Sequence, residues 1–334
     1  MSEAASAHET PKLLAANGLV RHFRKPKRTP FSARAVVRAV EGVSFYIRPG
    51  ETLGLVGESG CGKSTTGRMV IGIDQPTEGD VKFNDVDLST LTKGDLQNLR
   101  RDIQMIFQDP LGALDPRIAV GTQIREPLDI HDIGPADGRD DAVQEMLAAV
   151  GMPPEMAARY PHELSGGQAQ RIVIARALIV KPKLLVCDEP VSALDVSVQA
   201  QVIDLLADLQ RKMGIAYLFI SHDLKVVKHL SHRIAVMYLG QIVEQGPCDL
   251  VFEDPKHPYT KALISAIPNP DPTVKPSRIL LSGDPPSPLS PPDGCRFHTR
   301  CQVAFERCSN EVPHFRDVGD ARHAACHLLD GDDD

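Results

Sequence analysis

Short apolar runs alternate with longer segments of helical periodicity between about residues 40 and 245. The runs at 52–56, 103–107, 184–187 and 217–220 are mostly aliphatic or aromatic, and each is followed by a turn or a polar segment. Such runs are typical of strands that helices cover on both faces. Between them, the segment 196–213 places its apolar residues on one face of a helix. The pattern predicts an α/β fold built on a buried sheet.

The pattern changes after residue 265, where prolines become frequent up to 293. A proline-rich segment cannot form a helix or a central strand, so an extended surface connector is expected there. We therefore predict a disordered N-terminus, a main domain, a proline-rich connector, a cysteine-rich region and an acidic tail, with the boundaries 1–15, 16–265, 266–293, 294–328 and 329–334.

Charge and composition narrow the class of protein. The net charge of −7, from 37 basic and 44 acidic residues, argues against a general nucleic-acid binder. A basic run at 21–38 is expected to be a solvated loop, with contact to phosphate or lipid head groups as the alternative. The N-terminus lacks the apolar core of a secretory signal, and no run reaches the roughly 18 apolar residues of a membrane span. A cytosolic chain with reduced thiols is expected.

A phosphate-binding loop follows the first of these strands. The sequence from 57 to 65 fits G-x-x-x-x-G-K-[ST] and precedes a helical stretch. Its glycines allow successive N–H groups to face phosphate oxygens, and the helix adds the positive end of its dipole. The candidate ATP-binding residues are Gly57, Glu58, Ser59, Gly60, Cys61, Gly62, Lys63, Ser64 and Thr65.

Two acids end the strand at 184–187. Asp188 and Glu189 would stand at the carboxyl edge of the sheet, where open α/β sheets bind ligands. Asp188 is expected to hold Mg²⁺, and Glu189 to orient and deprotonate the attacking water.

Four further motifs make the chain resemble the ATP-binding cassette (ABC) ATPases. Leu-Ser-Gly-Gly-Gln at 164–168 resembles the family signature, and Ser-Ala-Leu-Asp at 192–195 resembles the D-loop. His222 resembles the switch histidine and Gln108 the Q-loop glutamine. The resemblance implies a RecA-like core with a β subdomain and a helical subdomain. It also implies the cofactors ATP and Mg²⁺.

The same resemblance implies residue roles. Glu189, His222, Gln108 and Lys63 would be catalytic, and Mg²⁺ would be held by Ser64, Gln108 and Asp188. Phe23 would stack on adenine, with Phe31 or a plain core role for Phe23 as alternatives. The signature and D-loop residues would act on the ATP of a partner cassette, and they are Ser165, Gly166, Gly167, Gln168 and Asp195.

Segments in the last third resemble the oligopeptide and dipeptide permease ATPases, most closely a second ATPase subunit. These are His-Pro-Tyr-Thr-Lys-Ala-Leu at 257–263 and the stretches 281–288 and 291–298. Importers of nickel chelates, glutathione or sugars remain alternatives, as does a soluble non-transport ABC ATPase. Asp115, where relatives usually carry asparagine, and Ala169, where a longer polar residue is common, are departures from the pattern.

This resemblance also implies partners and location. We expect a second, paralogous ATPase subunit forming a heterodimer, two integral-membrane permease subunits and, indirectly, an extracytoplasmic peptide-binding protein. Nucleic acid is not expected as a partner. The subunit would be peripheral, on the cytoplasmic face of the plasma (inner) membrane.

Four of the seven cysteines cluster near the C-terminus, at Cys295, Cys301, Cys308 and Cys326. Their gaps are wider than the C-x2-4-C pairs of zinc ribbons, and they suit a loop wrapped around a [4Fe–4S] cluster. The permease ATPases carry the same arrangement. A [4Fe–4S] cluster is expected, with Zn²⁺ or unliganded thiols as alternatives. It would act as a structural clip for a tail with little apolar surface, the alternative being a redox sensor.

Overall fold

The computed structural model describes residues 11–25, 35–268 and 278–330. The first ten residues, the middle half of the basic run (26–34, which includes Phe31) and the last four residues of the acidic tail lie outside the described residues. The described ends of the basic run, 21–24 and 36–38, belong to strands, so the expectation of a solvated loop is wrong there. In the described ranges, no helix is long and apolar enough to cross a membrane.

The larger sheet contains eight strands within the described ranges, in the order β11-β12-β10-β9-β3-β8-β7-β6. Its central strands pair in parallel and are almost wholly buried. They are β3 (Thr52–Val56), β6 (Ile103–Ile106), β7 (Leu184–Asp188), β8 (Ala216–Ser221) and β9 (Arg233–Tyr238). The four apolar runs predicted to be strands are therefore confirmed, within a residue or two at their ends.

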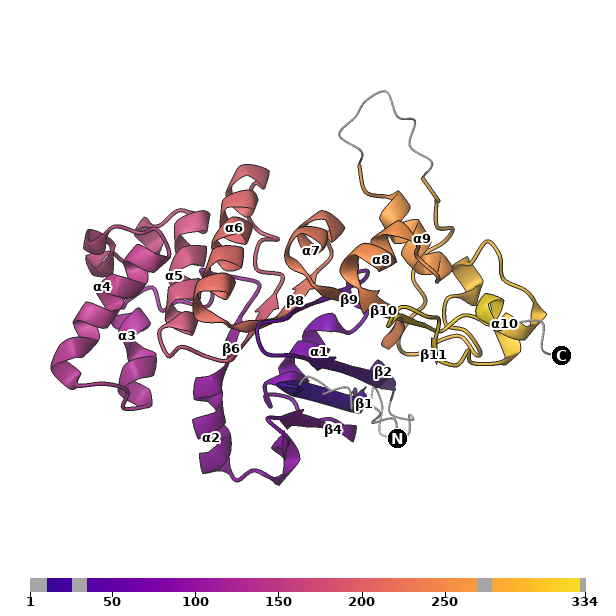
Figure 1. Ribbon diagram of the computed structural model, residues 1–334, viewed down its shortest axis with the longest axis horizontal. Coiled ribbons are helices and arrows are strands. Elements are labelled where there is room, and N and C mark those ends of the chain that lie inside the picture. The colour runs from indigo at the N-terminus through magenta and orange to yellow at the C-terminus, as the bar shows by residue number, and fades with distance from the viewer. Residues whose placement is uncertain (1–10, 26–34, 269–277, 331–334) are drawn as a thin grey trace, which may run out of the picture.

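A second, antiparallel sheet covers one side of the core (Figure 1). Its strands run in the order β2-β1-β4-β5, with Leu14 paired to Ile47 and to Phe83 across the first two interfaces. Both interfaces contribute to an apolar cluster shared with the inner face of the larger sheet. The strands are β1 (Leu14–Arg24), β2 (Val36–Ile47), β4 (Glu78–Phe83) and β5 (Val86–Asp87).

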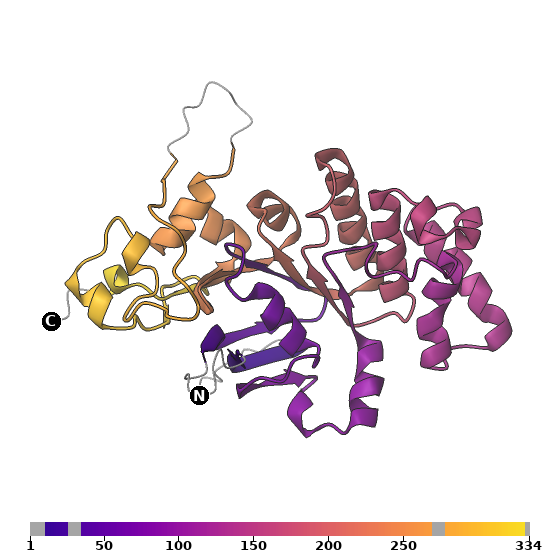
Figure 2. The same cartoon turned by 180° about the vertical axis from the view of Figure 1, so that it is seen from behind.

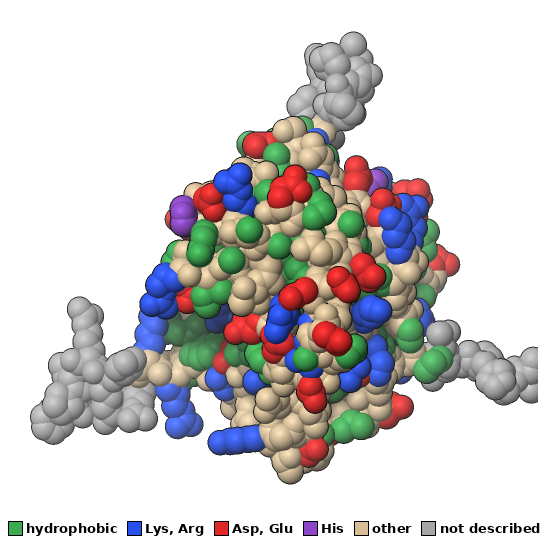
Figure 3. Space-filling model, turned by 90° about the vertical axis from the view of Figure 1, so that its left-hand side faces the viewer, with side chains coloured by type: hydrophobic (Ala, Val, Ile, Leu, Met, Phe, Trp, Pro, Cys, Tyr) green, Lys and Arg blue, Asp and Glu red, His purple; other side chains and the backbone are tan. Residues whose placement is uncertain are grey.

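Helices α3 (Val120–Ile130), α4 (Arg139–Ala149) and α5 (Gly166–Leu178) pack together beside β6 and form a helical lobe at one end of the molecule (Figures 1 and 2). Figure 3 looks onto this end, where acidic and basic side chains are interspersed. Arg139 illustrates the mixing, since it pairs with Asp129 at 2.9 Å and with Asp132 at 2.6 Å.

The remaining helices lie outside this lobe. Helix α6 spans Val196–Met213, as the apolar spacing predicted, and ends at Gly214, whose φ of 68° permits the turn. The others are α1 (Lys63–Val70), α2 (Lys93–Asp102), α7 (Leu224–Leu230), α8 (Cys248–Glu253), α9 (Pro258–Ser265) and α10 (Glu306–Asn310).

The cysteine-rich region is built onto the larger sheet. Strand β10 (Gln241–Pro247) pairs with β12 (His323–Ala324), which in turn pairs with β11 (Arg316–Asp317). The described connector residues from 278 to 293 contain no helix or strand, as their prolines predicted. The region lies at the end of the molecule opposite the helical lobe (Figures 1 and 2).

Candidate functional site

The phosphate-binding loop joins β3 to α1. Gly57, Gly60 and Gly62 have positive φ angles of 154°, 78° and 107°. A Cβ at Gly57 would lie 2.1 Å from the carbonyl oxygen of Met237, and one at Gly62 would lie 2.2 Å from that of Ala39. Only glycine fits these two positions, because backbone conformation and space both exclude a side chain.

Lys63 opens α1 and is almost fully buried. Its ammonium group donates to the carbonyl oxygens of Gly57, at 2.8 Å, and Glu58, at 3.0 Å. The loop borders a cavity of about 210 Å³ that combines backbone donors, the helix start and the residues predicted to act on phosphate. Its lining consists of Val37, Ala39, Ser59, Gly60, Gly62, Lys63, Ser64, Thr65, Gln108, Glu189 and Pro288.

Two of the predicted Mg²⁺ ligands are in contact. The Ser64 hydroxyl donates to Asp188 at 2.8 Å, across the end of β7. Burial raises the pKa of Asp188, the Ser64 hydrogen bond lowers it, and the neighbouring Glu189 raises it again. A cation at this point would relieve both unfavourable effects by stabilising the carboxylate.

Glu189 is held by two of the other predicted catalytic residues. Gln108 donates to its carboxylate at 3.2 Å, and His222 Nδ1 lies 3.4 Å from the same oxygen. Gln108 thus contacts the predicted base rather than completing a trio with Ser64 and Asp188. Glu189 has a φ of 48°, a left-handed conformation that carries strain for a non-glycine residue. Strain of this kind is concentrated at functional sites.

The signature residues form the start of α5. Ser165 caps the helix by accepting from the Gln168 N–H at 3.3 Å, and the Gln168 side chain accepts from the Ser165 N–H at 2.9 Å. A Cβ at Gly167 would lie 2.5 Å from Val198 Cγ1, so a glycine lets α5 pack against α6. The backbone N–H groups in the first turn of α5 stand at the positive end of the helix dipole.

The predicted D-loop aspartate caps α6. Asp195 accepts from the Val198 N–H at 3.0 Å and from the Ser197 hydroxyl at 2.7 Å, and these hydrogen bonds lower its pKa. Val196 beside it is 82% exposed, which is unusual for an aliphatic side chain. The cap therefore accounts for Asp195 locally.

Phe23 lies at the end of β1 and is 36% exposed, with the Arg21 guanidinium 4.7 Å from its ring centre. An exposed ring is available for stacking, and the stacking of Phe23 on adenine stays a prediction. Cys61, inside the phosphate loop, is buried, and burial raises its pKa. A buried thiol with a raised pKa is a small space-filling side chain rather than a reactive group.

The four C-terminal cysteines are free thiols that lie near one another. Burial, the largest cause, and the other three thiols together raise the pKa of Cys295 to about 11. Across the described ranges, however, no three His, Cys, Asp or Glu side chains form a group that could hold a metal ion. The predicted [4Fe–4S] cluster, and the zinc alternative, are therefore not supported by this geometry.

Three residues distant in the sequence contact the phosphate loop or line its cavity, and no sequence motif predicted these positions. The Tyr259 hydroxyl accepts from the Glu58 N–H at 2.9 Å, and the Arg300 guanidinium binds the Glu58 carboxylate. Pro288 lines the cavity, and its carbonyl accepts from the Arg38 N–H at 3.0 Å. All three lie far along the chain from the loop, so only paired variation among relatives could have revealed them.

A phosphate loop between strand β3 and helix α1, with two acids at the carboxyl end of β7 in the same parallel sheet, defines a P-loop nucleoside triphosphatase. The chain matches the ABC transporter family over residues 40–192, and the "Oligopeptide/dipeptide transporter, C-terminal region" family over 243–308. It belongs to the ABC transporter family, among the ATP-binding proteins that carry this C-terminal region.

Named relatives are similar to this chain over most of their length. The chain is 53% identical to a probable peptide ABC transporter ATP-binding protein, y4tS, of Sinorhizobium fredii, covering 88% of this chain and 83% of that one. It is 50% identical to the di/tripeptide transport ATP-binding protein DppF of Pseudomonas aeruginosa, covering 94% and 97%. Among solved structures, the dimeric ATP-binding cassette MJ0796 bound to ADP and Pi has a TM-score of 0.63 at 27% identity, covering 70% of this chain and 98% of that one.

Proposed function

We propose that this chain is the ATP-binding and ATP-hydrolysing subunit of a bacterial ABC importer for di- and oligopeptides. The observation that carries the ATPase assignment is the Glu189 carboxylate, held between Gln108 and His222 beside the phosphate loop. The peptide assignment is supported by the C-terminal family match and by relatives named for peptide transport.

In this proposal, Lys63 and the loop N–H groups bind the β- and γ-phosphates. Ser64 and Asp188, which are in contact, would hold Mg²⁺, and the ion would supply positive charge against the phosphates; Gln108, the third predicted ligand, contacts Glu189 instead. Glu189 accepts the proton of the attacking water, while His222 and Gln108 hold its carboxylate in place. Phe23 is assigned to adenine stacking.

A second cassette is needed to complete the site. The phosphate loop follows β3, whereas the signature helix α5 packs beside β6. β3 and β6 stand three strand spacings apart in the sheet, roughly 14 Å at about 4.8 Å per strand. The signature residues Ser165, Gly166, Gly167 and Gln168, with Asp195, are therefore assigned to ATP on a paralogous partner cassette. ATP then favours the closed dimer, and hydrolysis releases it.

The expected assembly adds two membrane permease subunits and an extracytoplasmic peptide-binding protein, with this chain at the cytoplasmic face of the inner membrane. Closure of the cassettes would reach the permeases through the segment after Gln108. Exposed apolar side chains there, Leu111 and Ile118, support a contact role.

We also propose the domain boundaries predicted from the sequence, and a metal bound by the four C-terminal cysteines. What supports a metal is the proximity of four buried or half-buried thiols, whose joint ionisation would be unfavourable without a cation. No step of the mechanism depends on it. Visible absorption, with iron and sulfide analysis after anaerobic purification, tests the [4Fe–4S] assignment, and a colourless, zinc-loaded protein would favour zinc.

Reconstitution tests the transport proposal. The chain is co-expressed with the permease and ATPase subunits of a peptide importer and placed in liposomes with a peptide-binding protein. ATP-dependent accumulation of labelled dipeptide is expected, and Glu189→Gln should abolish it. Uptake of a nickel chelate, glutathione or a sugar in place of peptide would reassign the substrate. Purification with ribosomes or DNA instead of membrane subunits would overturn the transport assignment.

A further inference from the structure

Glu58 is the second residue of the phosphate loop, where a carboxylate would repel the phosphates of a nucleotide. Its charge is matched by Arg300 of the cysteine-rich region, 242 residues later in the chain. The guanidinium binds both carboxylate oxygens, with Nη1 to Oε2 at 2.7 Å and Nη2 to Oε1 at 3.1 Å. Arg300 is 7% exposed and Glu58 27%, so the pair is shielded from water on one side.

The backbone of Glu58 is held as well. Its N–H donates to the fully buried Tyr259 hydroxyl, and its carbonyl accepts from Lys63. The Tyr259 ring packs against Tyr238 and Phe297 with ring centres 4.7 and 5.4 Å apart. The start of the phosphate loop is therefore fixed by partners from α9 and the cysteine-rich region.

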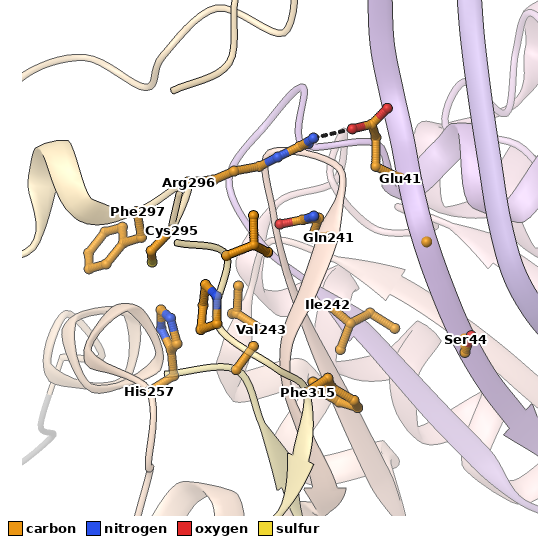
Figure 4. A pocket seen from close by; sticks show the side chains of 14 residues that line it. Glu41, Ser44, Gln241, Ile242, Val243, His257, Cys295, Arg296, Phe297 and Phe315 are labelled. Atoms are coloured by element: carbon orange, nitrogen blue, oxygen red, sulfur yellow. Dashed lines mark hydrogen bonds and ion pairs between the residues drawn. The ribbon is translucent and has the colours of Figure 1, made fainter. Parts of the chain in front are cut away.

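A second arginine of the same region supports the neighbouring backbone. Arg296 reaches across the edge of a cavity of about 230 Å³ to pair with Glu41 of β2 (Figure 4). Its other nitrogen donates to the Leu239 carbonyl. The next residue, Gly240, donates its N–H to the Cys61 carbonyl within the phosphate loop at 2.9 Å. Two arginines thus connect the cysteine-rich region to the loop by separate routes.

We propose that Arg300 is a positioning residue for nucleotide binding, acting through Glu58. The guanidinium neutralises the carboxylate and anchors the start of the loop, so that the cavity favours a polyanion. This inference rests on the proposed function, in which the loop binds ATP. It assigns part of the ATP affinity to the cysteine-rich region.

The test uses Arg300→Gln in the full chain, assembled with its partner subunits. Titration with Mg-ATP and a fluorescent ATP analogue should show affinity about ten- to one-hundredfold weaker, the effect of losing charge-assisted hydrogen bonds. KM should rise in parallel, while kcat at saturating ATP stays close to the wild-type value. Arg300→Lys keeps the charge without the two-point contact, so an intermediate affinity is expected.

Arg322→Gln is the matched control. Arg322 is as buried as Arg300 and belongs to the same region, but it pairs with Asp254 and Asp320 away from the loop. It should leave ATP affinity unchanged even if it lowers the melting temperature. A loss of affinity equal to that of Arg300→Gln would show that general destabilisation is the cause, and would overturn the proposal.

Glu58→Gln supplies the decisive comparison. In the Arg300→Gln background it removes the unpaired carboxylate and should restore at least part of the affinity. If affinity is not restored, neutralisation is not the role of Arg300. Wild-type affinity in Arg300→Gln, or in Arg300→Lys if the first variant does not fold, also refutes the inference. Failure of the wild-type assembly to bind ATP would instead refute the proposed function.

Discussion

Replacing Glu189 by glutamine separates ATP binding from hydrolysis. Glutamine has the same shape, and its amide oxygen can still accept from Gln108, now 3.2 Å from the carboxylate. The left-handed backbone at this position is equally open to both residues. What changes is basicity, since an amide cannot take a proton from water at neutral pH.

The expected fall in kcat follows from the loss of the general base alone. A positioned general base contributes about 100- to 10,000-fold to a rate, so kcat of Glu189→Gln should fall by that factor. The proposed phosphate contacts come from Lys63 and the loop, and the closest predicted cation ligands, Ser64 and Asp188, are untouched. ATP affinity should therefore stay within about threefold of wild type, or tighten slightly because a negative charge near the phosphates is gone.

Phosphate release and equilibrium ATP binding are measured on the same preparation of the assembled complex, and the closed dimer is followed by size-exclusion chromatography with ATP. The variant should bind ATP, accumulate as the closed dimer and release almost no phosphate. Asp188→Asn serves as the comparison, because it should weaken the Mg²⁺ dependence of binding itself. Wild-type turnover by Glu189→Gln would refute the assignment of the general base.

Three further changes are informative. Lys63→Ala should weaken ATP binding at least tenfold in the same titration, because it removes the only ammonium group on the loop; unchanged affinity would contradict its role. His222→Ala should keep ATP affinity and lower kcat about a hundredfold, because it frees the Glu189 carboxylate on one side; a change confined to KM would argue against it. Burial lowers the pKa of His257 from 6.5 to about 3, so below about pH 6.5 the unfolded chain binds a proton that the folded chain does not. Stability should therefore fall by about 1.4 kcal/mol per pH unit down to about pH 3. His257→Asn keeps an acceptor for the Tyr259 N–H, and urea unfolding at pH 7.5 and 5.5 should show a smaller loss for it than for wild type.

The local pattern of apolar residues was enough to predict the central strands of the larger sheet and helix α6. The strands were predicted because each is buried on both faces and therefore reads as a continuous apolar run. Helix α6 was predicted from the apolar residues on one of its faces, and its ends agree because Asp195 and Gly214 cap it at those boundaries. The site motifs could also be recognised in the sequence, because each is a short segment whose chemistry depends on consecutive residues.

Contacts between distant segments were not predictable from one sequence. Glu58 was recognised as part of the phosphate-loop motif, but only the fold shows that Arg300, 242 residues later in the chain, is its partner. The integration of the cysteine-rich region into the larger sheet was also missed, because β11 and β12 are two residues long each and carry no periodicity. The cysteine spacing favoured an iron–sulfur cluster, which the geometry of the described side chains does not support.

The arrangement of the site divides its residues into two groups with different kinetic effects. Glu189, Gln108 and His222 contact one another at the strand ends, on the side where the γ-phosphate and water would lie. Glu58, with its partners from α9 and the cysteine-rich region, lies at the opposite start of the loop. Changes in the first group should act on kcat and changes in the second on ATP affinity. Because the second group includes residues outside the cassette proper, the C-terminal region can set the ATP concentration at which the importer operates without altering the chemical step.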